Sequence, residues 1–566
     1  MEITRARVAA WAAGSGLLWS LAWPYVGGFT WVAFFAWLPL LHAERLHSQR
    51  TANKARSFFP YVWITTLIWN GLGAWWFYNV SEPLETRLVS GTAPLVVNSL
   101  LMTIPWWLKR VVNKRFGMQW AAWAFIVFWI AFERLHHGWD LQWPWFSIGN
   151  VFGTQPVWIQ WYEITGMLGG TLWVLLVTLI LDRALVTWIG NGPRKKIVTN
   201  TSIAVALVAI PIAISLARFY TYQQEGSTAE VVVVQPNIDP YNEKFGGVDA
   251  LIQLDRMLAL ARTMVTDSTQ LVLLPETALQ ENATVDGSSG TQKFLGLWEN
   301  DLHASKSVQR IKEFQEEFPH VSILAGMNSD SLYPATGPRP IAARPLYRDL
   351  PPDMEAEQRW YVAYNAALWM PAKGPIVSYH KSKLVAGVEQ LPFDNVLGPI
   401  GALVVDLGGT TGSLGKQKIR SVLMDGNSEL RVIPAICYES EFGEHIAAHV
   451  RNGGNLLAVI TNDGWWGDSP GYKQHITFAT IRAIEMRRDV ARSANTGISC
   501  FSDQRGVLRD HTDWWVPTVI RSTVHLNAKI TFYAAHGDFI GLVAMVLAST
   551  LLLVLVVYAV LIKIHS

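Results

Sequence analysis

The chain has 566 residues, of which 50% are hydrophobic and 16% are charged, and its formal net charge is +2. This composition excludes an ordinary soluble protein, in which about a quarter of the residues are charged. The apolar residues also gather in segments of about 20 residues, the length that crosses a bilayer as a helix. We therefore expect a membrane protein.

Seven apolar segments precede residue 220, and one more lies at the C-terminal end. They cover roughly residues 8–22, 25–43, 58–79, 89–108, 117–135, 157–181, 198–218 and 539–562. The first segment lacks a small-residue cleavage site and runs into the second, so we interpret it as an anchor rather than a signal peptide. We predict eight transmembrane α-helices: a seven-helix transmembrane domain (1–219), a domain outside the membrane (220–538) and a C-terminal transmembrane helix (539–566).

Alternate loops between these segments are basic. The N-terminus carries Arg5 and Arg7, and the later basic residues are Arg45, Arg50, Lys54, Arg56, Lys109, Arg110, Lys114, Arg115, Arg183, Arg194, Lys195 and Lys196. Basic loops stay in the cytoplasm. Both termini should therefore be cytoplasmic, and residues 220–538 should lie on the outer side.

Many of the 28 Trp residues lie near predicted helix ends. One interpretation is an aromatic belt at the two membrane–water interfaces. A second interpretation is a surface for lipid headgroups in the outer loop Gln142-Trp143-Pro144-Trp145. It makes Trp143 and Trp145 candidate substrate-binding residues.

The outer domain alternates strand-like and helical patterns. The strand-like runs are Ala229–Val234, Gln270–Leu274, Val321–Ala325, Trp360–Met370, Arg431–Ile436, Asn455–Thr461 and Val490–Phe501. Helical patterns cover residues 248–265, 306–317, 441–451 and 474–488. Apolar strands separated by helices predict a layered α/β domain with covered sheets. The Pro-, Gly- and Arg-rich stretch 332–359 is typical of a long surface loop.

Three residues with suitable chemistry stand at the ends of apolar strands in this domain. Glu276 closes Leu-Val-Leu-Leu-Pro-Glu, Lys381 follows Ile-Val-Ser-Tyr-His, and Cys437 follows Arg-Val-Ile-Pro-Ala-Ile. The turn at Cys437 should place its sulfur near a helix N-terminus, whose N–H groups favour a thiolate. A carboxylate, an ammonium and a thiol in this arrangement are a candidate catalytic set.

The chain has one other cysteine, Cys500. It lies inside the run Val490–Phe501, and we expect a buried, inert thiol there. A structural disulfide between Cys437 and Cys500 is the alternative. The 14 His residues show no metal-ligand spacing with Cys, and no glycine-rich phosphate loop is visible, so we expect no metal and no cofactor.

Four motifs, in this order, carry a resemblance to a known family. They are Pro-Glu-Thr-Ala from residue 275, Tyr-His-Lys-Ser-Lys-Leu-Val from residue 379, Ile-Cys-Tyr-Glu from residue 436 and Asn-Asp-Gly-Trp-Trp-Gly from residue 462. They resemble the nitrilase superfamily, which has a Glu-Lys-Cys triad on an αββα sandwich. With seven apolar segments before it and one after, the whole chain resembles the apolipoprotein N-acyltransferase family.

The resemblance implies roles residue by residue. Glu276 matches the general base, Lys381 the catalytic lysine and Cys437 the nucleophile. Supporting active-site positions are matched by Glu389, Tyr438 and Glu439. In the reaction that the resemblance implies, Lys381 and the Tyr438 backbone N–H stabilise the oxyanion.

The chain departs from the family at two places. It reads Leu-Val-Ala-Gly-Val-Glu at residues 384–389, where the family usually has Leu-Val-Pro-Phe-Gly-Glu. The family also has a functional Trp shortly after the first strand of the domain, and here Phe245 is the nearest candidate for that substrate contact.

Structural roles remain alternatives for several of these residues. Glu389 could form a salt bridge with Lys381 or Lys383. Glu439, Glu441 and Glu444 cluster at a helix start, where the dipole favours acidic residues. For Asp463, Trp465 and Trp466, a pocket wall and core packing are both open.

The resemblance implies an acyltransferase that moves an acyl chain from a phospholipid, through a Cys437 thioester, to the N-terminal S-diacylglyceryl cysteine of an apolipoprotein. The implied partners are these two substrates and the lipid bilayer, with no nucleic acid, and we expect a monomer. The implied location is the bacterial cytoplasmic (inner) membrane, with the catalytic domain in the periplasm.

Two other functions compete with this interpretation. A membrane-anchored extracytoplasmic amidase or nitrilase is disfavoured because seven helices with Trp-rich loops exceed what an anchor requires. A transporter is disfavoured because the apolar segments contain few charges, which usually mark transport paths.

Overall fold

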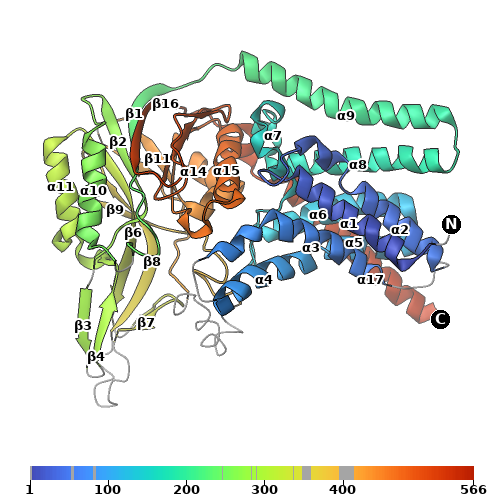
Figure 1. Ribbon diagram of the computed structural model, residues 1–566, viewed down its shortest axis with the longest axis horizontal. Helices are drawn as coiled ribbons and strands as arrows, with labels where there is room; N and C mark the ends of the chain where they lie inside the picture. The colour runs from blue at the N-terminus through green and yellow to red at the C-terminus, as the bar shows by residue number, and fades with distance from the viewer. Residues whose placement is uncertain are drawn as a thin grey trace. The chain divides into compact units, whose positions relative to one another are not determined.

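The computed structural model describes residues 3–51, 57–80, 84–244, 247–281, 283–287, 290–334, 337–346, 359–393, 413–426 and 428–565. The chain divides into two compact units (Figure 1). We call Met1–Tyr78, Arg87–Tyr222 and Thr531–Ser566 the helical unit, and Asn79–Thr86 with Gln223–Ile530 the sandwich unit. The expected boundaries at 219/220 and 538/539 lie close to the divisions at 222/223 and 530/531.

Helices of very different length build the helical unit. The α-helices are α1 (Arg5–Ala22), α2 (Leu38–Arg50), α3 (Phe59–Gly73), α4 (Leu84–Leu101), α5 (Ile104–Phe116), α6 (Met118–His136), α7 (Tyr162–Thr165), α8 (Met167–Ile189), α9 (Arg194–Thr221), α16 (Phe532–His536) and α17 (Phe539–His565). Short 3₁₀ helices are η1 (Thr30–Phe34), η2 (Trp75–Asn79), η3 (Ile148–Thr154) and η4 (Pro156–Trp158). Within the described residues, four helical stretches are long and apolar enough to cross a membrane: Arg87–Phe116, Met167–Ile189, Arg194–Thr221 and Phe539–Leu561.

The expected second segment, 25–43, is not a single helix. Tyr25 and Gly28 both have positive φ, of 58° and 75°, so the chain turns before η1 begins. A Cβ on Gly27 would lie 2.2 Å from the carbonyl oxygen of Leu21, which shows how tightly the chain reverses there. Hydropathy alone predicted one crossing at 25–43, and that prediction is wrong because the backbone turns within the segment.

Many Trp side chains pack inside the helical unit instead of standing at its surface. Trp19 stacks on Trp69 with ring centroids 4.4 Å apart, and Trp37 meets Trp129 edge-on at 4.9 Å. All four are fully buried. These residues form a core, so the expected aromatic belt does not account for them.

Two β-sheets form the centre of the sandwich unit. The first has the order β16-β1-β2-β6-β8-β7, with β5 beside β6 and β9 beside β8; its strands are β1 (Ser227–Gln235), β2 (Thr269–Leu279), β5 (Leu297–Trp298), β6 (Ser322–Tyr333), β7 (Arg344–Pro345), β8 (Trp360–Met370), β9 (Val377–His380) and β16 (Thr518–Leu526). The second has the order β10-β11-β12-β13-β14-β15, built from β10 (Leu423–Met424), β11 (Arg431–Ile436), β12 (Leu456–Thr461), β13 (Asp489–Ala494), β14 (Cys500–Ser502) and β15 (Leu508–Arg509). A separate hairpin joins β3 (Ala283–Gly287) to β4 (Gly290–Phe294).

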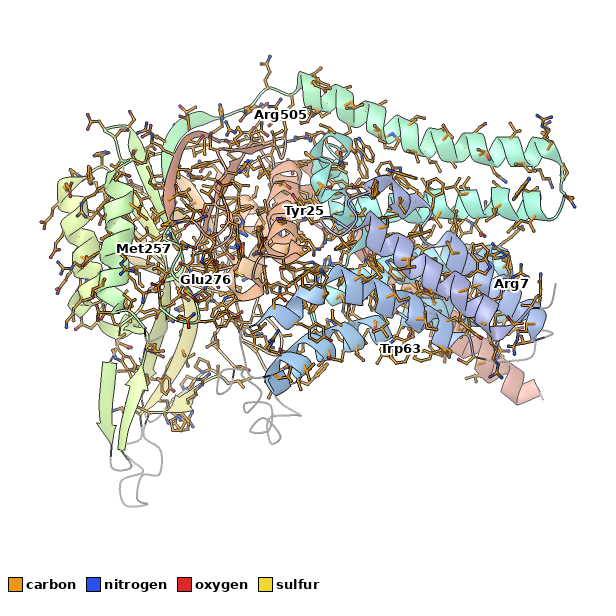
Figure 2. The ribbon with its side chains drawn as sticks, in the orientation of Figure 1. Arg7, Tyr25, Trp63, Met257, Glu276 and Arg505 are labelled. Atoms are coloured by element: carbon orange, nitrogen blue, oxygen red, sulfur yellow. The ribbon has the colours of Figure 1, made fainter. Side chains whose placement is uncertain are left out.

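Helices cover the outer face of each sheet (Figure 1). α10 (Ala250–Arg262) and α11 (Lys306–Glu317) pack on the first sheet through one hydrophobic core, which includes Met257 of α10 (Figure 2). A second core, which includes Val231, Leu273 and Ile460, lies between the two sheets. α14 (Gly443–Arg451) and α15 (Pro470–Met486) cover the second sheet. The layers are therefore αββα, as the resemblance implied.

The central strands are parallel and buried on both faces, which is why their sequences are continuous apolar runs. The sequence predicted β8, β11 and α11 with the bounds that the structure has. The run Val490–Phe501 is instead two antiparallel strands, β13 and β14, with a turn at Gly497 whose φ is +117°. Of the expected loop 332–359, residues 335–336 and 347–358 lie outside the described part, and β7 forms between them.

Candidate active site

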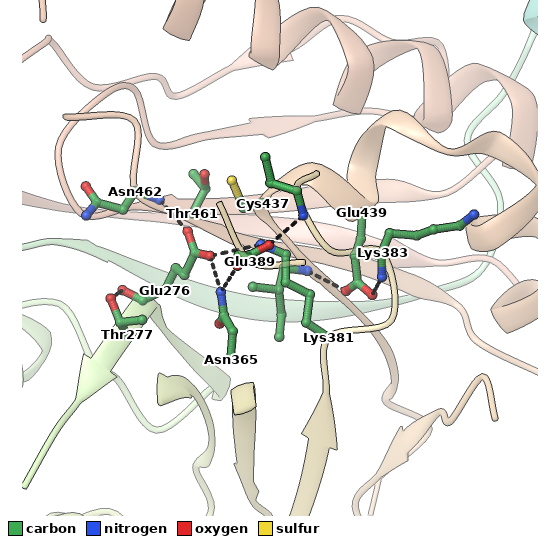
Figure 3. A network of polar contacts seen from close by, with 12 residues as sticks. Glu276, Thr277, Asn365, Lys381, Lys383, Glu389, Cys437, Glu439, Thr461 and Asn462 are labelled. Carbon is green, nitrogen blue, oxygen red and sulfur yellow. Dashed lines mark hydrogen bonds and ion pairs between the residues drawn. The ribbon is translucent and has the colours of Figure 1, made fainter. Parts of the chain in front are cut away.

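The ends of three strands bring Glu276, Lys381 and Cys437 together (Figure 3). Glu276 is near the end of β2, Lys381 directly follows β9, and Cys437 directly follows β11. Because β2 and β11 belong to different sheets, the site is built across the two inner sheets of the sandwich.

A local irregularity of β2 directs Glu276. The parallel register of β2 with β6 shifts between Leu274 and Leu279, and Thr277 has a φ of +51°. Gly326 of β6 faces this kink, and a Cβ there would lie 2.5 Å from the Cα of Glu276. Glycine is thus required at 326 for β2 to bend while the two strands stay paired.

Three groups hold the buried side chain and backbone of Glu276. Its Oε1 accepts a hydrogen bond from Asn365 Nδ2 at 2.8 Å, and its Oε2 accepts one from the Asn462 backbone N–H at 3.0 Å (Figure 3). Lys244 Nζ donates to the Glu276 carbonyl at 2.9 Å. Burial lowers the pKa of Lys244 to about 7, although the charge of Glu276 opposes this.

Lys381 lies between two carboxylates. Its Nζ is 2.8 Å from Glu389 Oε1 and 3.4 Å from Glu276 Oε1, and its side chain is 1% exposed. Burial alone would lower the pKa of Lys381, but the charges of Glu389 and Glu276 outweigh burial and raise it. Lys381 is therefore an ammonium ion at neutral pH and cannot act as a base. Lys383, by contrast, points to the ring of Phe442 at 4.5 Å.

Glu389 also shapes its own loop. Its Oε2 accepts the backbone N–H of Val385 at 2.8 Å, and Gly387 turns the chain between them with a φ of +84°. Asn365 Nδ2 donates to Glu389 Oε1 at 2.8 Å, so one amide links both carboxylates (Figure 3). The salt bridge to Lys381 that the sequence left open is present, within a network centred on Lys381.

Cys437 occupies a strained turn. Its φ is +51°, and the 3₁₀ helix that it begins, η8 (Cys437–Glu441), has only 5 residues. Burial and the charge of Glu276 raise the pKa of the Cys437 thiol well above its usual range, while Lys381 acts in the opposite direction. The predicted thiolate is wrong for this resting site, because burial and a nearby carboxylate outweigh a helix too short to have a strong dipole. The thiol therefore needs a base.

The two cysteines differ as expected, although both are free thiols. Cys437 is partly exposed, whereas Cys500 is buried in β14 and burial raises its pKa to about 11. The disulfide alternative does not hold in this structure.

A buried network supports the Cys437 turn from behind. His475 Nε2 lies 3.3 Å from the Cys437 carbonyl oxygen, and its Nδ1 lies 2.9 Å from Asp463 Oδ1. Arg492 Nη2 donates to Asp463 Oδ2 at 2.7 Å. Asp463 is therefore part of the scaffold of the nucleophile.

Glu439 ties the lysine motif to the cysteine turn. One carboxylate oxygen accepts the Tyr379 hydroxyl at 2.8 Å and the Ser382 N–H at 2.7 Å, and the other accepts the Ile436 N–H at 2.9 Å. Burial would raise the pKa of Glu439, but His445 and these backbone donors lower it to about 2. Glu439 thus fixes the positions of Lys381 and Cys437 relative to each other.

The remaining candidates of the sandwich unit lie close to this network. Tyr438 is buried next to Cys437, with its ring against Phe442. Trp466 meets the His475 ring edge-on at 5.7 Å, and both Trp465 and Trp466 are half-buried. Phe245 lies outside the described residues.

The two Trp candidates of the helical unit differ in burial. Trp145, expected at a lipid-facing rim, is 4% exposed and packs on Trp76 at 4.9 Å. Trp143 is half-buried and contacts Phe77 at 5.2 Å. Trp145 is therefore not a rim residue, because a neighbouring aromatic side chain covers it.

Sequence reasoning missed Asn365, Lys244 and Asn462. Asn365 carried a usable signal, since it is a single amide in the otherwise apolar run Trp360–Met370, and a buried amide must find partners. Asn462 begins the motif Asn-Asp-Gly-Trp-Trp-Gly, but the bond from its backbone N–H to Glu276 depends on tertiary contacts, as does the role of Lys244.

The chain is similar to known proteins along most of its length. Residues 15–180 match the family model for the apolipoprotein N-acyltransferase N-terminal domain, and residues 346–530 match that for carbon-nitrogen hydrolases. The apolipoprotein N-acyltransferase of Chlorobaculum tepidum is 28% identical over 95% of both chains. That of Geobacter metallireducens is 25% identical over 73% of this chain and 70% of its own. A solved Saccharomyces cerevisiae structure from the nitrilase superfamily covers 55% of this chain and 94% of its own, with 14% identity and a TM-score of 0.35.

The two family models match successive parts of the chain, and the Chlorobaculum relative aligns over 95% of it. The chain therefore belongs to the apolipoprotein N-acyltransferases, a membrane family with a carbon-nitrogen hydrolase domain.

Proposed function

We propose that the protein transfers an acyl chain from a phospholipid to the N-terminal S-diacylglyceryl cysteine of apolipoproteins, through a thioester on Cys437. The observation that carries this proposal is the buried Lys381 ammonium, held 2.8 Å from Glu389 and 3.4 Å from Glu276, at the strand end next to the Cys437 thiol. The family membership supplies the two substrates.

The pKa directions assign the acid–base roles. The Cys437 thiol has a raised pKa and is protonated at rest. Lys381 has a raised pKa and keeps its protons. Glu276 is the carboxylate left to accept the thiol proton. Asn365 and Lys381 donate to its Oε1 and the Asn462 backbone N–H donates to its Oε2, and these contacts hold it at the site.

The first half-reaction forms the thioester. Glu276 takes the thiol proton while the sulfur attacks the ester carbonyl, and Lys381 stabilises the oxyanion together with the Tyr438 backbone N–H. The C–O bond then breaks, and Glu276 returns its proton to the departing lysophospholipid oxygen. An oxyanion donor of this kind contributes about 2.7–4 kcal/mol.

The second half-reaction forms the amide. The amino group of the acceptor attacks the thioester carbonyl, Glu276 accepts a proton from the nitrogen, and the C–S bond breaks. The proton then returns to the sulfur and restores the resting thiol. The same carboxylate therefore serves both steps.

We further propose that the long apolar helices anchor the protein in the bacterial inner membrane with the sandwich unit in the periplasm. Alternating basic loops support this orientation. Both substrates are lipid-anchored, so a tethered enzyme meets them without extracting either into water. A membrane-impermeant thiol reagent should label a cysteine introduced at the exposed residue Ile341 in intact spheroplasts. Labelling that requires lysis would contradict the orientation.

Thioester trapping tests the reaction itself. Purified protein in detergent micelles should take up one labelled acyl chain from phospholipid, bound to Cys437 and released by hydroxylamine. Addition of a diacylglyceryl lipopeptide should then move the label to the peptide amine. Release of free fatty acid with no transfer to the peptide would favour the amidase-like hydrolase instead.

A further inference from the structure

Glu441 is a buried carboxylate that the proposed reaction does not use. It is the last residue of η8, four positions after Cys437, and it is 1% exposed. Among the described residues, neither of its carboxylate oxygens has a hydrogen-bond partner. A buried, unpartnered carboxyl group is costly, so its presence in the short helix that begins with Cys437 calls for a function.

The neighbouring cations are committed elsewhere. Arg482 of α15 donates to the backbone carbonyl of Glu441 at 3.2 Å, but its guanidinium pairs with the side chain of Glu485 at 3.0 Å. Lys381 is close enough for its charge to act on Glu441, yet it pairs with the two catalytic carboxylates. Burial consequently raises the pKa of Glu441 well above its usual range, although both cations oppose this.

The two cations that act on Glu441 are already paired with other groups. Among the described residues, Lys381 pairs with Glu276 and Glu389, and Arg482 pairs with Glu485. A ligand that brings a positive group to Glu441 would supply the missing partner and ionise the carboxyl group.

From this geometry we infer that Glu441 is the binding site for a primary ammonium group of a substrate. The inference rests on the proposed function. It has two possible sources: the α-ammonium of the acceptor cysteine, and the ammonium of an ethanolamine headgroup on the donor. Both would form a charge-assisted hydrogen bond with the carboxylate.

The acceptor source fits the proton balance of the second half-reaction. An α-amino group has a pKa of about 7.7–8.0, so at neutral pH most of the acceptor arrives as an ammonium ion. Glu441 would hold this ion while Glu276 takes one proton and releases it to water. The free amine then attacks, the C–N bond forms and the C–S bond breaks. A second proton passes from the nitrogen to the sulfur, and the product is a neutral amide with a neutral thiol.

Half-reactions measured separately in the full-length protein test this site. Glu441→Gln keeps the shape of the side chain and removes its charge. Glu444→Gln is the control, because Glu444 lies three residues further on and pairs with Arg451 at the surface. Thioester formation is measured with phosphatidylethanolamine and with phosphatidylglycerol, and discharge is measured with a diacylglyceryl lipopeptide and with hydroxylamine, which is mostly uncharged at neutral pH.

If the acceptor is the ligand, Glu441→Gln lowers kcat/KM for the lipopeptide by about tenfold to a hundredfold, the value of one hydrogen bond to a charged group. Thioester formation from both phospholipids and discharge by hydroxylamine stay at the wild-type rate. If the headgroup is the ligand, only thioester formation from phosphatidylethanolamine falls.

The inference is overturned if every reaction falls equally in Glu441→Gln, or if none changes, while the variant remains folded by its melting temperature. A wild-type protein that forms no thioester from phospholipid would refute the proposed function instead. The two failures are therefore distinguishable.

Discussion

Asn365 links the two carboxylates that flank Lys381, and replacing it by Leu should slow acylation strongly. Its Nδ2 donates to Glu276 Oε1 and to Glu389 Oε1, each at 2.8 Å, from a side chain that is 6% exposed. Asn365→Leu removes both hydrogen bonds and keeps a side chain of similar size. Among the described residues, the partner that remains for Glu276 Oε1 is then Lys381, at the longer distance of 3.4 Å.

The magnitude follows from the kind of bond that is lost. A hydrogen bond to a charged group contributes about 1.5–3 kcal/mol. The bond to Glu276 positions the base directly, so its loss corresponds to a rate of thioester formation that is about tenfold to a hundredfold lower. Asn365→Asp should be worse, because it replaces the shared hydrogen-bond donor by a third carboxylate that repels the other two.

Single-turnover formation of the hydroxylamine-sensitive acyl-enzyme measures this effect. Asn455→Leu is the matched control. Its amide is also buried and also makes two hydrogen bonds, to the Arg431 N–H and the Glu429 carbonyl, but it lies at the other end of the second sheet, at the start of β12. Both variants should lose about 1–3 kcal/mol of stability. Equal losses of activity in the two variants would refute a specific role for Asn365.

Four further outcomes follow from the same geometry. Cys437→Ala should abolish the acyl-enzyme, whereas Cys500→Ala should keep most activity; inactivity of a folded Cys500→Ala protein would contradict this assignment. Lys381→Ala should stop thioester formation, while Lys383→Ala should be mild, since its ammonium faces a ring outside the carboxylate network; equal loss in both would show that the lysine register is wrong. Without substrate, alkylation of Cys437 by iodoacetamide should be slow at pH 7 and rise only above the usual thiol range, because its raised pKa leaves little thiolate at neutral pH; fast alkylation at pH 7 would indicate a preformed thiolate. Gly326→Ala should displace the base and cut the acylation rate by about a hundredfold with the fold retained; wild-type kinetics would show that β2 accommodates the methyl group.

Much of the sandwich could be predicted from the sequence because its central strands are buried on both faces. Such strands leave continuous apolar runs, and the runs at β8 and β11 have the bounds that the structure shows. The edge strand β16 was missed because it alternates buried and exposed positions and pairs with β1, nearly 300 residues earlier. The tertiary fold decides which strand β16 pairs with, and the local sequence of β16 does not indicate this pairing.

The meeting of the three candidate residues was predictable, and their electrostatics were not. Motif order identified Glu276, Lys381 and Cys437, and the structure brings them together. The protonation state of Cys437 could not be read from the sequence, because it depends on burial and on the distance to Glu276 across two sheets. In the same way, hydropathy found the apolar segment 25–43 but not the turn at Gly28.

The pairing of one ammonium with two carboxylates explains how a protonated thiol can be an effective nucleophile here. At rest, Lys381 faces two anions, Glu276 and Glu389. When Glu276 takes the thiol proton it becomes neutral, and the thiolate replaces it as the second anion. The net charge of the buried site is therefore the same before and after proton transfer. A fixed net charge avoids the large cost of creating an uncompensated charge in a buried place. Glu389 makes this possible, because it remains the partner of Lys381 while the negative charge moves from Glu276 to the sulfur.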